Sequence, residues 1–120
     1  MKRTGPTNLE LKNLILELKK KSSDSKILLW KRIARDLEKP SRQRRKANLY
    51  RINRYTRDDE IALVPGKVLS LGNIEKKITI AALNFSDHAI IKINAAGAKA
   101  ITIKELLKQN PEGKKVRIIG

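Results

Sequence analysis

The sequence predicts an α/β (α+β) protein: a basic N-terminal helical hairpin and arm, followed by a compact core of strands and helices. Two apolar patterns with helical spacing stand near the start of the 120 residues, and short aliphatic runs alternate with helix-capping signals after residue 58. A chain of this length holds one compact unit or a small core with an extended arm. Because aromatics make up only 3% of the chain, the core must be mainly aliphatic.

The first 40 residues predict two amphipathic helices that pack as a hairpin. Thr7 to Glu10 has a capping-box pattern, a hydroxyl three residues before a carboxylate, and precedes apolar residues at helical spacing. The cluster Ser22 to Ser25 is expected to break this helix. A second apolar stripe begins before Trp30 and stops at Lys39-Pro40. Because Trp30 lies on this stripe, we interpret it as the buried anchor between the helices and not as a base-stacking residue.

After residue 58 the pattern becomes that of an α/β core. Apolar runs at 61–64 and 68–71 predict short strands, and Pro65-Gly66 between them fits a type II turn. A run at 78–85 predicts a buried strand, and Ser86-Asp87 then begins a helix that ends at Gly97. A short strand, a helix that begins with the capping box Thr102 to Glu105, and a terminal strand at 116–119 follow. This order predicts at least some parallel pairing.

The positive charge is concentrated in the first half of the chain. The net charge is +16, and residues 1–57 hold 18 basic and 5 acidic residues (+13), against 10 and 7 in residues 58–120 (+3). Such a chain repels itself unless a polyanion supplies the countercharge, and nucleic acid is the obvious polyanion. We therefore predict a basic hairpin with an Arg-rich RNA-binding segment at 1–57 and an α/β core at 58–120.

The charge is densest between Pro40 and Arg57, where seven cations and no acid stand among 18 residues. Apolar residues and two tyrosines interleave with these cations and provide stacking planes as well as charge. We favour an RNA-threading segment over a solvated basic loop. Arg42, Arg44 and Arg45 belong to no apolar stripe, so folding is expected not to depend on them. The predicted RNA-binding residues are Lys2, Arg3, Lys39, Arg42, Arg44, Arg45, Lys46, Asn48, Arg51, Asn53, Arg54, Tyr55, Arg57 and Lys67.

The sequence offers no motif for catalysis or metal binding. There is no Cys and one His, which excludes disulfides, thiol nucleophiles and zinc sites built from these residues. Pro65-Gly66-Lys67 lacks the preceding Gly and the following Ser or Thr of a phosphate loop. We interpret His88 as a surface histidine, and Asp58 to Glu60 as a turn or a weak magnesium-associated patch. We expect no catalytic residue, metal, cofactor or small-molecule substrate.

Two other classes of protein remain open at this point. A DNA-compacting basic protein would also neutralise phosphates, although it would place cations along its folded elements instead of confining them to residues 1–57. An enzyme acting on RNA is the third alternative. No apolar run approaches the roughly 18 to 20 residues of a membrane span, and the first six residues lack the apolar stretch of a signal peptide. We expect a cytoplasmic protein without a membrane partner.

Several motifs occur in the order in which one family carries them. They are Leu37-Glu38-Lys39-Pro40, Ile52-Asn53-Arg54-Tyr55-Thr56, Val64-Pro65-Gly66-Lys67-Val68-Leu69 and Asn110-Pro111-Glu112-Gly113. A fifth motif, the shared core box at 95–102, has a helix that ends at glycine and is followed by a strand. With these motifs the sequence resembles the L-eighteen-e ribosomal proteins of archaea and eukaryotes, which are related in their C-terminal core to the bacterial L-fifteen protein. The similarity runs from about Thr4 to Ile119.

The resemblance implies a structural constituent of the large ribosomal subunit that binds and stabilises 23S-type rRNA. It implies a basic N-terminal part that passes among rRNA helices and a core described as an irregular superhelix of strand-strand-helix units. Neighbouring large-subunit ribosomal proteins are implied as further partners. The compact length is similar to that of archaeal members. Ser41 departs from the family pattern, since relatives often carry another Arg at this position.

Overall fold

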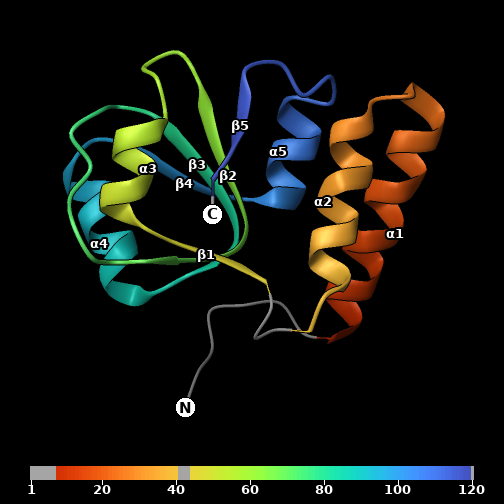
Figure 1. The fold of residues 1–120 in the computed structure, drawn as a ribbon, viewed down its shortest axis with the longest axis horizontal. Coiled ribbons are helices and arrows are strands. Elements are labelled where there is room, and N and C mark those ends of the chain that lie inside the picture. Colours follow the sequence, from red (N-terminus) through yellow and green to blue (C-terminus); the bar gives the residue numbers. More distant parts are fainter. Residues whose placement is uncertain (1–7, 41–43, 120) are drawn as a thin grey trace.

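The computed structural model describes residues 8–40 and 44–119, which form one sheet with helices on both faces (Figure 1). The helices in these ranges are α1 (Asn8–Ser25), α2 (Leu28–Glu38), α3 (Leu49–Tyr55), α4 (Asp87–Ala95) and α5 (Ile103–Gln109). The strands are β1 (Arg45–Asn48), β2 (Ile61–Leu69), β3 (Thr79–Phe85), β4 (Lys99–Thr102) and β5 (Val116–Ile118). The predicted α/β class is confirmed.

The described strands pair in parallel throughout, in the order β1-β2-β3-β4, with β5 also beside β2. β5 pairs with Ile61 to Leu63, and β1 pairs with Gly66 to Leu69. Since β3 occupies the other side of β2, β1 and β5 lie one after the other along the same edge of β2. Parallel neighbours need crossover connections, and α3 and α4 lie in two of them.

The predicted type II turn at Pro65-Gly66 is wrong, because both residues lie inside the continuous strand β2. Gly66 lacks the positive φ that the turn requires. Pro65 is tolerated because it lies between the residues paired with β5 and those paired with β1, at an irregularity in the register with β3. A Cβ on Gly66 would clash with the Arg45 carbonyl oxygen, so the glycine permits the close approach of β1.

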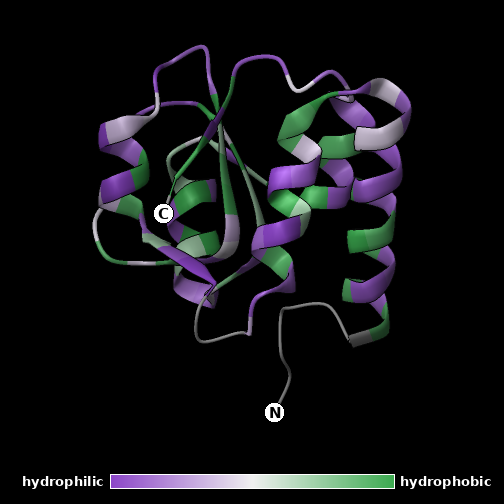
Figure 2. Cartoon of the chain, turned by 45° about the vertical axis from the view of Figure 1, so that its right-hand side comes forward, coloured by the Kyte–Doolittle hydropathy of each residue, from purple (hydrophilic) through white to green (hydrophobic). Residues whose placement is uncertain are grey.

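Each face of the sheet is buried under its own set of helices. On one face α3 and α4 cover a core that includes Val64, Ile80 and Ile93. On the other face α1, α2 and α5 cover a core that includes Leu63 and Trp30. Figure 1 shows the two sets on opposite sides of the strands, and Figure 2 shows hydrophobic and hydrophilic residues alternating along α1 and α2. The amphipathic hairpin therefore packs on the sheet with its apolar stripes.

Several local predictions are confirmed and one is wrong. Ser86 accepts a hydrogen bond from the Ala89 amide, and Thr102 forms the complete capping box with Glu105. The serine cluster does not break the first helix, because α1 continues to Ser25, whose hydroxyl donates to a carbonyl one turn earlier (2.6 Å). The chain leaves the helix one residue later, at a positive φ of 59°. The capping residue expected at position 7 lies outside the described residues.

Candidate nucleic-acid interface

The segment expected to thread RNA is folded, in its described part, into β1 and α3. The apolar residues that interleave with its cations are core residues: Ala47, Leu49 and Ile52 are buried against the sheet. The exposed cations of the segment are therefore carried on an anchored element: Lys46, Arg51, Arg54 and Arg57. Apolar residues interleaved with cations are expected in an RNA-threading segment and also in a short amphipathic strand and helix. The sequence alone therefore could not distinguish a threading segment from β1 and α3.

An exposed tyrosine flanked by two arginines lies at the end of α3. Tyr55 is 49% exposed, and the guanidinium carbons of Arg51 and Arg54 lie 5.4 and 5.5 Å from the centre of its ring. Each guanidinium is within the range of a cation–π contact. The three side chains together present a stacking plane and two bidentate phosphate donors on the surface.

Two lysines stand side by side on neighbouring strands. Lys46 of β1 is the register partner of Lys67 of β2, and both side chains are exposed. Like charges directly beside one another on a sheet destabilise it modestly. A bound anion would remove this repulsion.

Three of the predicted binding residues hold the end of α2 together. The buried carboxylate of Asp36 accepts from Arg45 (3.1 Å) and pairs with Lys39 (3.5 Å). Arg44 donates to the carbonyls of Leu37 and Lys39 at 3.2 and 3.1 Å, which are acceptors left free at the helix end. Arg44 and Arg45 thus make contacts inside the protein that the sequence did not indicate, and we expect their replacement to lower its stability.

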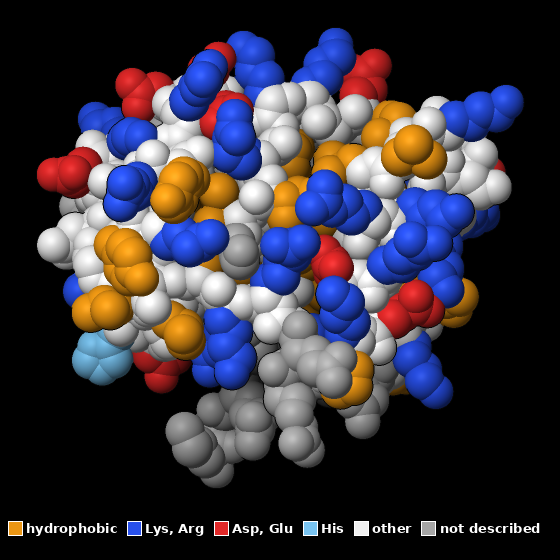
Figure 3. All heavy atoms as spheres, viewed as in Figure 1, with side chains coloured by type: hydrophobic (Ala, Val, Ile, Leu, Met, Phe, Trp, Pro, Cys, Tyr) orange, Lys and Arg blue, Asp and Glu red, His pale blue; other side chains and the backbone are white. Residues whose placement is uncertain are grey.

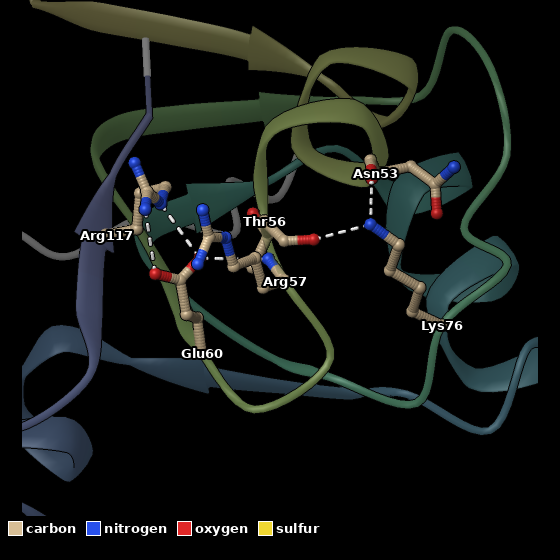
Figure 4. Close-up of polar contacts among 6 residues, drawn as sticks. All are labelled: Asn53, Thr56, Arg57, Glu60, Lys76 and Arg117. Atoms are coloured by element: carbon tan, nitrogen blue, oxygen red, sulfur yellow. Dashed lines mark hydrogen bonds and ion pairs between the residues drawn. The ribbon is translucent and has the colours of Figure 1, made fainter.

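The two predicted asparagines make hydrogen bonds within the protein. Asn48 accepts from the Leu71 amide (3.2 Å), and Asn53 both donates to and accepts from Glu75. The Lys76 ammonium donates to the carbonyls of Asn53 (2.8 Å) and Thr56 (2.6 Å) at the end of α3 (Figure 4). A cation at this end also interacts favourably with the helix carbonyls. These contacts fix α3 in place.

The turn after α3 is held by Glu60. Its carboxylate accepts from the Arg57 amide (2.9 Å) and, with both oxygens, from the Arg117 guanidinium (2.8 and 2.9 Å), as Figure 4 shows. The hydrogen bond from Arg117, followed by that from the Arg57 backbone, lowers the pKa of Glu60 to about 2. The same pair raises the pKa of Arg117. The side chain of Arg57 is left on the surface.

Two of the three acids in the turn after α3 form ion pairs with basic side chains. Glu60 binds Arg117, and Asp59 pairs with Lys115 at 3.4 Å. Within residues 8–40 and 44–119, no three His, Cys, Asp or Glu side chains gather where they could hold a metal ion.

His88 is exposed, as expected. No helix in the described part of the chain is long and apolar enough to cross a membrane.

The predicted binding residues thus divide into three groups. Lys2, Arg3 and Arg42 lie outside the described residues. The second group makes contacts inside the protein and consists of Lys39, Arg44, Arg45, Asn48 and Asn53. The third group is exposed and has two parts. Arg51, Arg54, Tyr55 and Arg57 lie on α3 and in the turn after it, and we call them the α3 face. Lys46 and Lys67 lie on β1 and β2 next to Ala47 and Val68, which belong to the core under α3, so strand alternation turns the two lysines to the opposite face of the sheet.

The sequence analysis missed the residues that hold the α3 face in position. Asp36, Glu60, Lys76 and Arg117 each anchor a backbone or side-chain group of the interface. Three of these contacts join positions 9, 20 and 57 residues apart. Only the bond between Glu60 and the Arg57 amide, three residues apart, is local enough to be expected from a turn pattern.

Comparison with known proteins shows the family of this chain. The model of the family described as ribosomal protein 60S L18 and 50S L18e matches residues 3–120. A large ribosomal subunit protein eL18 of Sulfurisphaera tokodaii is 43% identical, over 98% of this chain and 96% of the relative. The protein of the same name from Methanoregula boonei is 47% identical over 94% and 93%, and that from Methanopyrus kandleri is 44% identical over 97% and 95%. The chain therefore belongs to the family of ribosomal proteins 60S L18 and 50S L18e.

Proposed function

We propose that this protein binds and stabilises 23S-type rRNA in the large ribosomal subunit, and that it does so through the α3 face. Residues 1–57 would supply most of the RNA contacts, and residues 58–120 would supply four of the five described strands of the sheet that carries them. Neighbouring large-subunit proteins would be further partners. Lys2, Arg3 and Arg42 are proposed to add RNA contacts, and the second group of predicted residues to position the interface.

Family membership establishes the general role of the chain. The chain is a structural constituent of the large ribosomal subunit and not an enzyme, and it works on the ribosome, in the cytoplasm. The surface that binds rRNA is inferred from the exposed side chains.

The observation that carries the proposal is Tyr55 between two arginines. The exposed part of the Tyr55 ring can receive a base in exchange for a guanidinium contact, and base–aromatic stacking contributes about 1–3 kcal/mol per base. Arg51 and Arg54 are already aligned with the ring, so they can bond phosphates while the ring holds a base. The rigid mounting of α3 lowers the entropy that binding would cost.

The lysine pair on β1 and β2 supports the same ligand. Lys46 and Lys67 repel one another in the free protein, and phosphates between or beside them would relieve this repulsion. Lysine acts as a point charge and contributes affinity without reading a base. The α3 face and the lysine pair together offer stacking and unspecific charge, as proteins that bind single-stranded or looped RNA do.

The test is the salt dependence of rRNA affinity for the double variant Arg51→Gln/Arg54→Gln. Each lost phosphate contact lowers the slope of log affinity against log salt by about 0.7 for single strands, so a fall of roughly 1.4 is expected. The matched control is Lys99→Gln/Lys108→Gln, which removes the same charge from exposed positions outside the α3 face. A slope equal to that of wild type, with the fold intact by circular dichroism, would show that the α3 face does not bind RNA.

A further inference from the structure

A second basic surface lies along the helical hairpin, on the side of the sheet opposite α3. Two adjoining hollows between α1 and α2 share Lys19 and Glu38, and together they form what we call the hairpin groove. Arg44, after α2, lines one end. The basic lining residues are Lys12, Lys19, Lys26, Lys31, Arg35 and Arg44, against the single acid Glu38. Figure 3 shows Lys and Arg side chains gathered over α1 and α2.

Helix geometry aligns these side chains in two rows. Lys12, Leu16 and Lys19 follow one another at spacings of four and three residues on α1. Lys31 and Arg35 are four residues apart on α2. Residues three and four apart share a face of a helix, so each helix turns a basic row toward the groove, and Lys12 and Lys19 are separated by about 10 Å along the axis.

Most of this charge is not neutralised within the protein. Lys19 pairs with Glu38 at 2.7 Å, and Arg44 donates to two carbonyls. Lys12, Lys26, Lys31 and Arg35 make no ion pair with any other described residue, and all four are exposed. Cations gathered around a groove concentrate the positive potential there and attract anions.

The groove also has apolar walls. Leu16 is 64% exposed and Leu28 is 74% exposed, one on each helix, and both line the groove. An exposed leucine next to lysines on both sides has no role in the core. It can pack against sugar or base edges when the lysines hold the phosphates of the same strand.

We propose that the hairpin groove is a second RNA-binding surface and that the protein joins two separate segments of rRNA. This inference rests on the proposed function of the α3 face and extends it. Because α3 and the hairpin cover opposite faces of the sheet, one RNA strand cannot reach both without wrapping around the molecule. Lysines outnumber arginines four to two in the groove, so its contacts are with phosphates and not with specific bases.

The test is nuclease footprinting of protein-free large-subunit rRNA with the full chain and three double variants. Lys31→Gln/Arg35→Gln alters the groove, Arg51→Gln/Arg54→Gln alters the α3 face, and Lys99→Gln/Lys108→Gln is the charge-matched control. We expect wild type to protect two separate segments, the groove variant to lose one of them, and the α3 variant to lose the other. The groove variant should also lower the salt slope by roughly 1.4, with the control at the wild-type value.

The outcomes separate this inference from the function on which it rests. A groove variant with the wild-type footprint and slope would overturn the inference. A groove that binds an acidic protein instead of RNA would give this same result. One protected segment weakened equally by both variants would also overturn it. If the α3 variant keeps both segments while the groove variant loses one, the proposed α3 face fails and the groove stands.

Discussion

Glu60 is the residue whose ionisation is most strongly tied to the fold. Its carboxylate binds the Arg57 amide and the Arg117 guanidinium, and its pKa falls from an ordinary 4.5 to about 2. Since the folded-state pKa is depressed, the stabilisation is fully present above the unfolded pKa. It is lost as the pH falls through the range from about 4.5 to about 2. The turn between α3 and β2 is therefore expected to loosen in acid.

The first prediction is that NMR titration of the Glu60 side chain gives a pKa near 2. Replacing Arg117 with Leu removes the largest cause of the shift, so the pKa of Glu60 should rise towards its ordinary value. Glu60→Gln should remove this carboxylate's contribution to the pH dependence of unfolding below pH 4.5. A wild-type Glu60 that titrates near 4.5 would contradict the bidentate pair.

Trp30 gives the second prediction. It is fully buried and its indole nitrogen donates to the Pro111 carbonyl at 2.8 Å. Trp30→Ala should lower the free energy of unfolding by about 3–5 kcal/mol, as large aromatic truncations in cores do. Trp30→Phe keeps much of the packing and should lose less, about 1 kcal/mol of it from the hydrogen bond. Both are measured by urea unfolding; unchanged stability with lost RNA binding would make Trp30 a stacking residue.

The burial of Trp30 could be predicted from the sequence, but its partner could not. Its place on the apolar stripe of α2 is a local property, and the structure confirms that it is core. The hydrogen bond joins it to a carbonyl 81 residues further along the chain, in the loop after α5. The prediction of an anchor between two helices was therefore incomplete, because Trp30 also binds the hairpin to the loop between α5 and β5.

At the scale of elements, β2 is the described strand with the most partners in the sheet. It pairs with β3 on one side and with β1 and β5 on the other. The close approach of β1 requires that position 66 have no side chain, since a Cβ there would clash with the Arg45 carbonyl oxygen. A conflict with backbone cannot be relieved by turning a side chain, so β1 would have to move.

The third prediction is that Gly66→Ala lowers the free energy of unfolding by more than about 3 kcal/mol, the upper end of the usual cost of overpacking. The matched control is Gly97→Ala, where the added Cβ makes ordinary contacts of 3.6 Å or more and only the positive φ of 76° is unfavourable. That strain costs about 1–2 kcal/mol. If chemical denaturation gives Gly66→Ala a smaller loss than Gly97→Ala, the pairing of β1 with β2 is incorrect.

Element boundaries were predictable where the signal was local. Ser86 and Thr102 begin helices as their capping patterns predict, and Gly97 follows α4 with the positive φ that ends it. Pro65-Gly66 has the composition of a turn, but its role depends on β1 and β5, which are distant in sequence. The sequence pattern shows the residue types and not the neighbouring strands, so it could not distinguish a turn from a bulged strand.

At the scale of the whole molecule, the charge asymmetry predicted a nucleic-acid partner but not the shape of the surface. Of the net charge, +13 falls in residues 1–57, and the structure distributes the described residues of this range over both faces of the sheet. Some of the cations neutralise Asp36 or cap a helix, and others stay exposed on α3 and in the hairpin groove. Counting charges along the chain cannot separate these roles, because they depend on which acids and carbonyls the fold brings near.

The central claim, that this protein belongs to the large ribosomal subunit and is held there by rRNA, is tested most directly by sedimentation. Cell extract is fractionated on sucrose gradients at low and high salt, after treatment with RNase, DNase or neither. We predict that the protein travels with the large subunit at low salt, that high salt weakens the association, and that RNase but not DNase releases it. Most of the protein in a DNase-sensitive nucleoid fraction would contradict this account and make it a DNA-compacting protein.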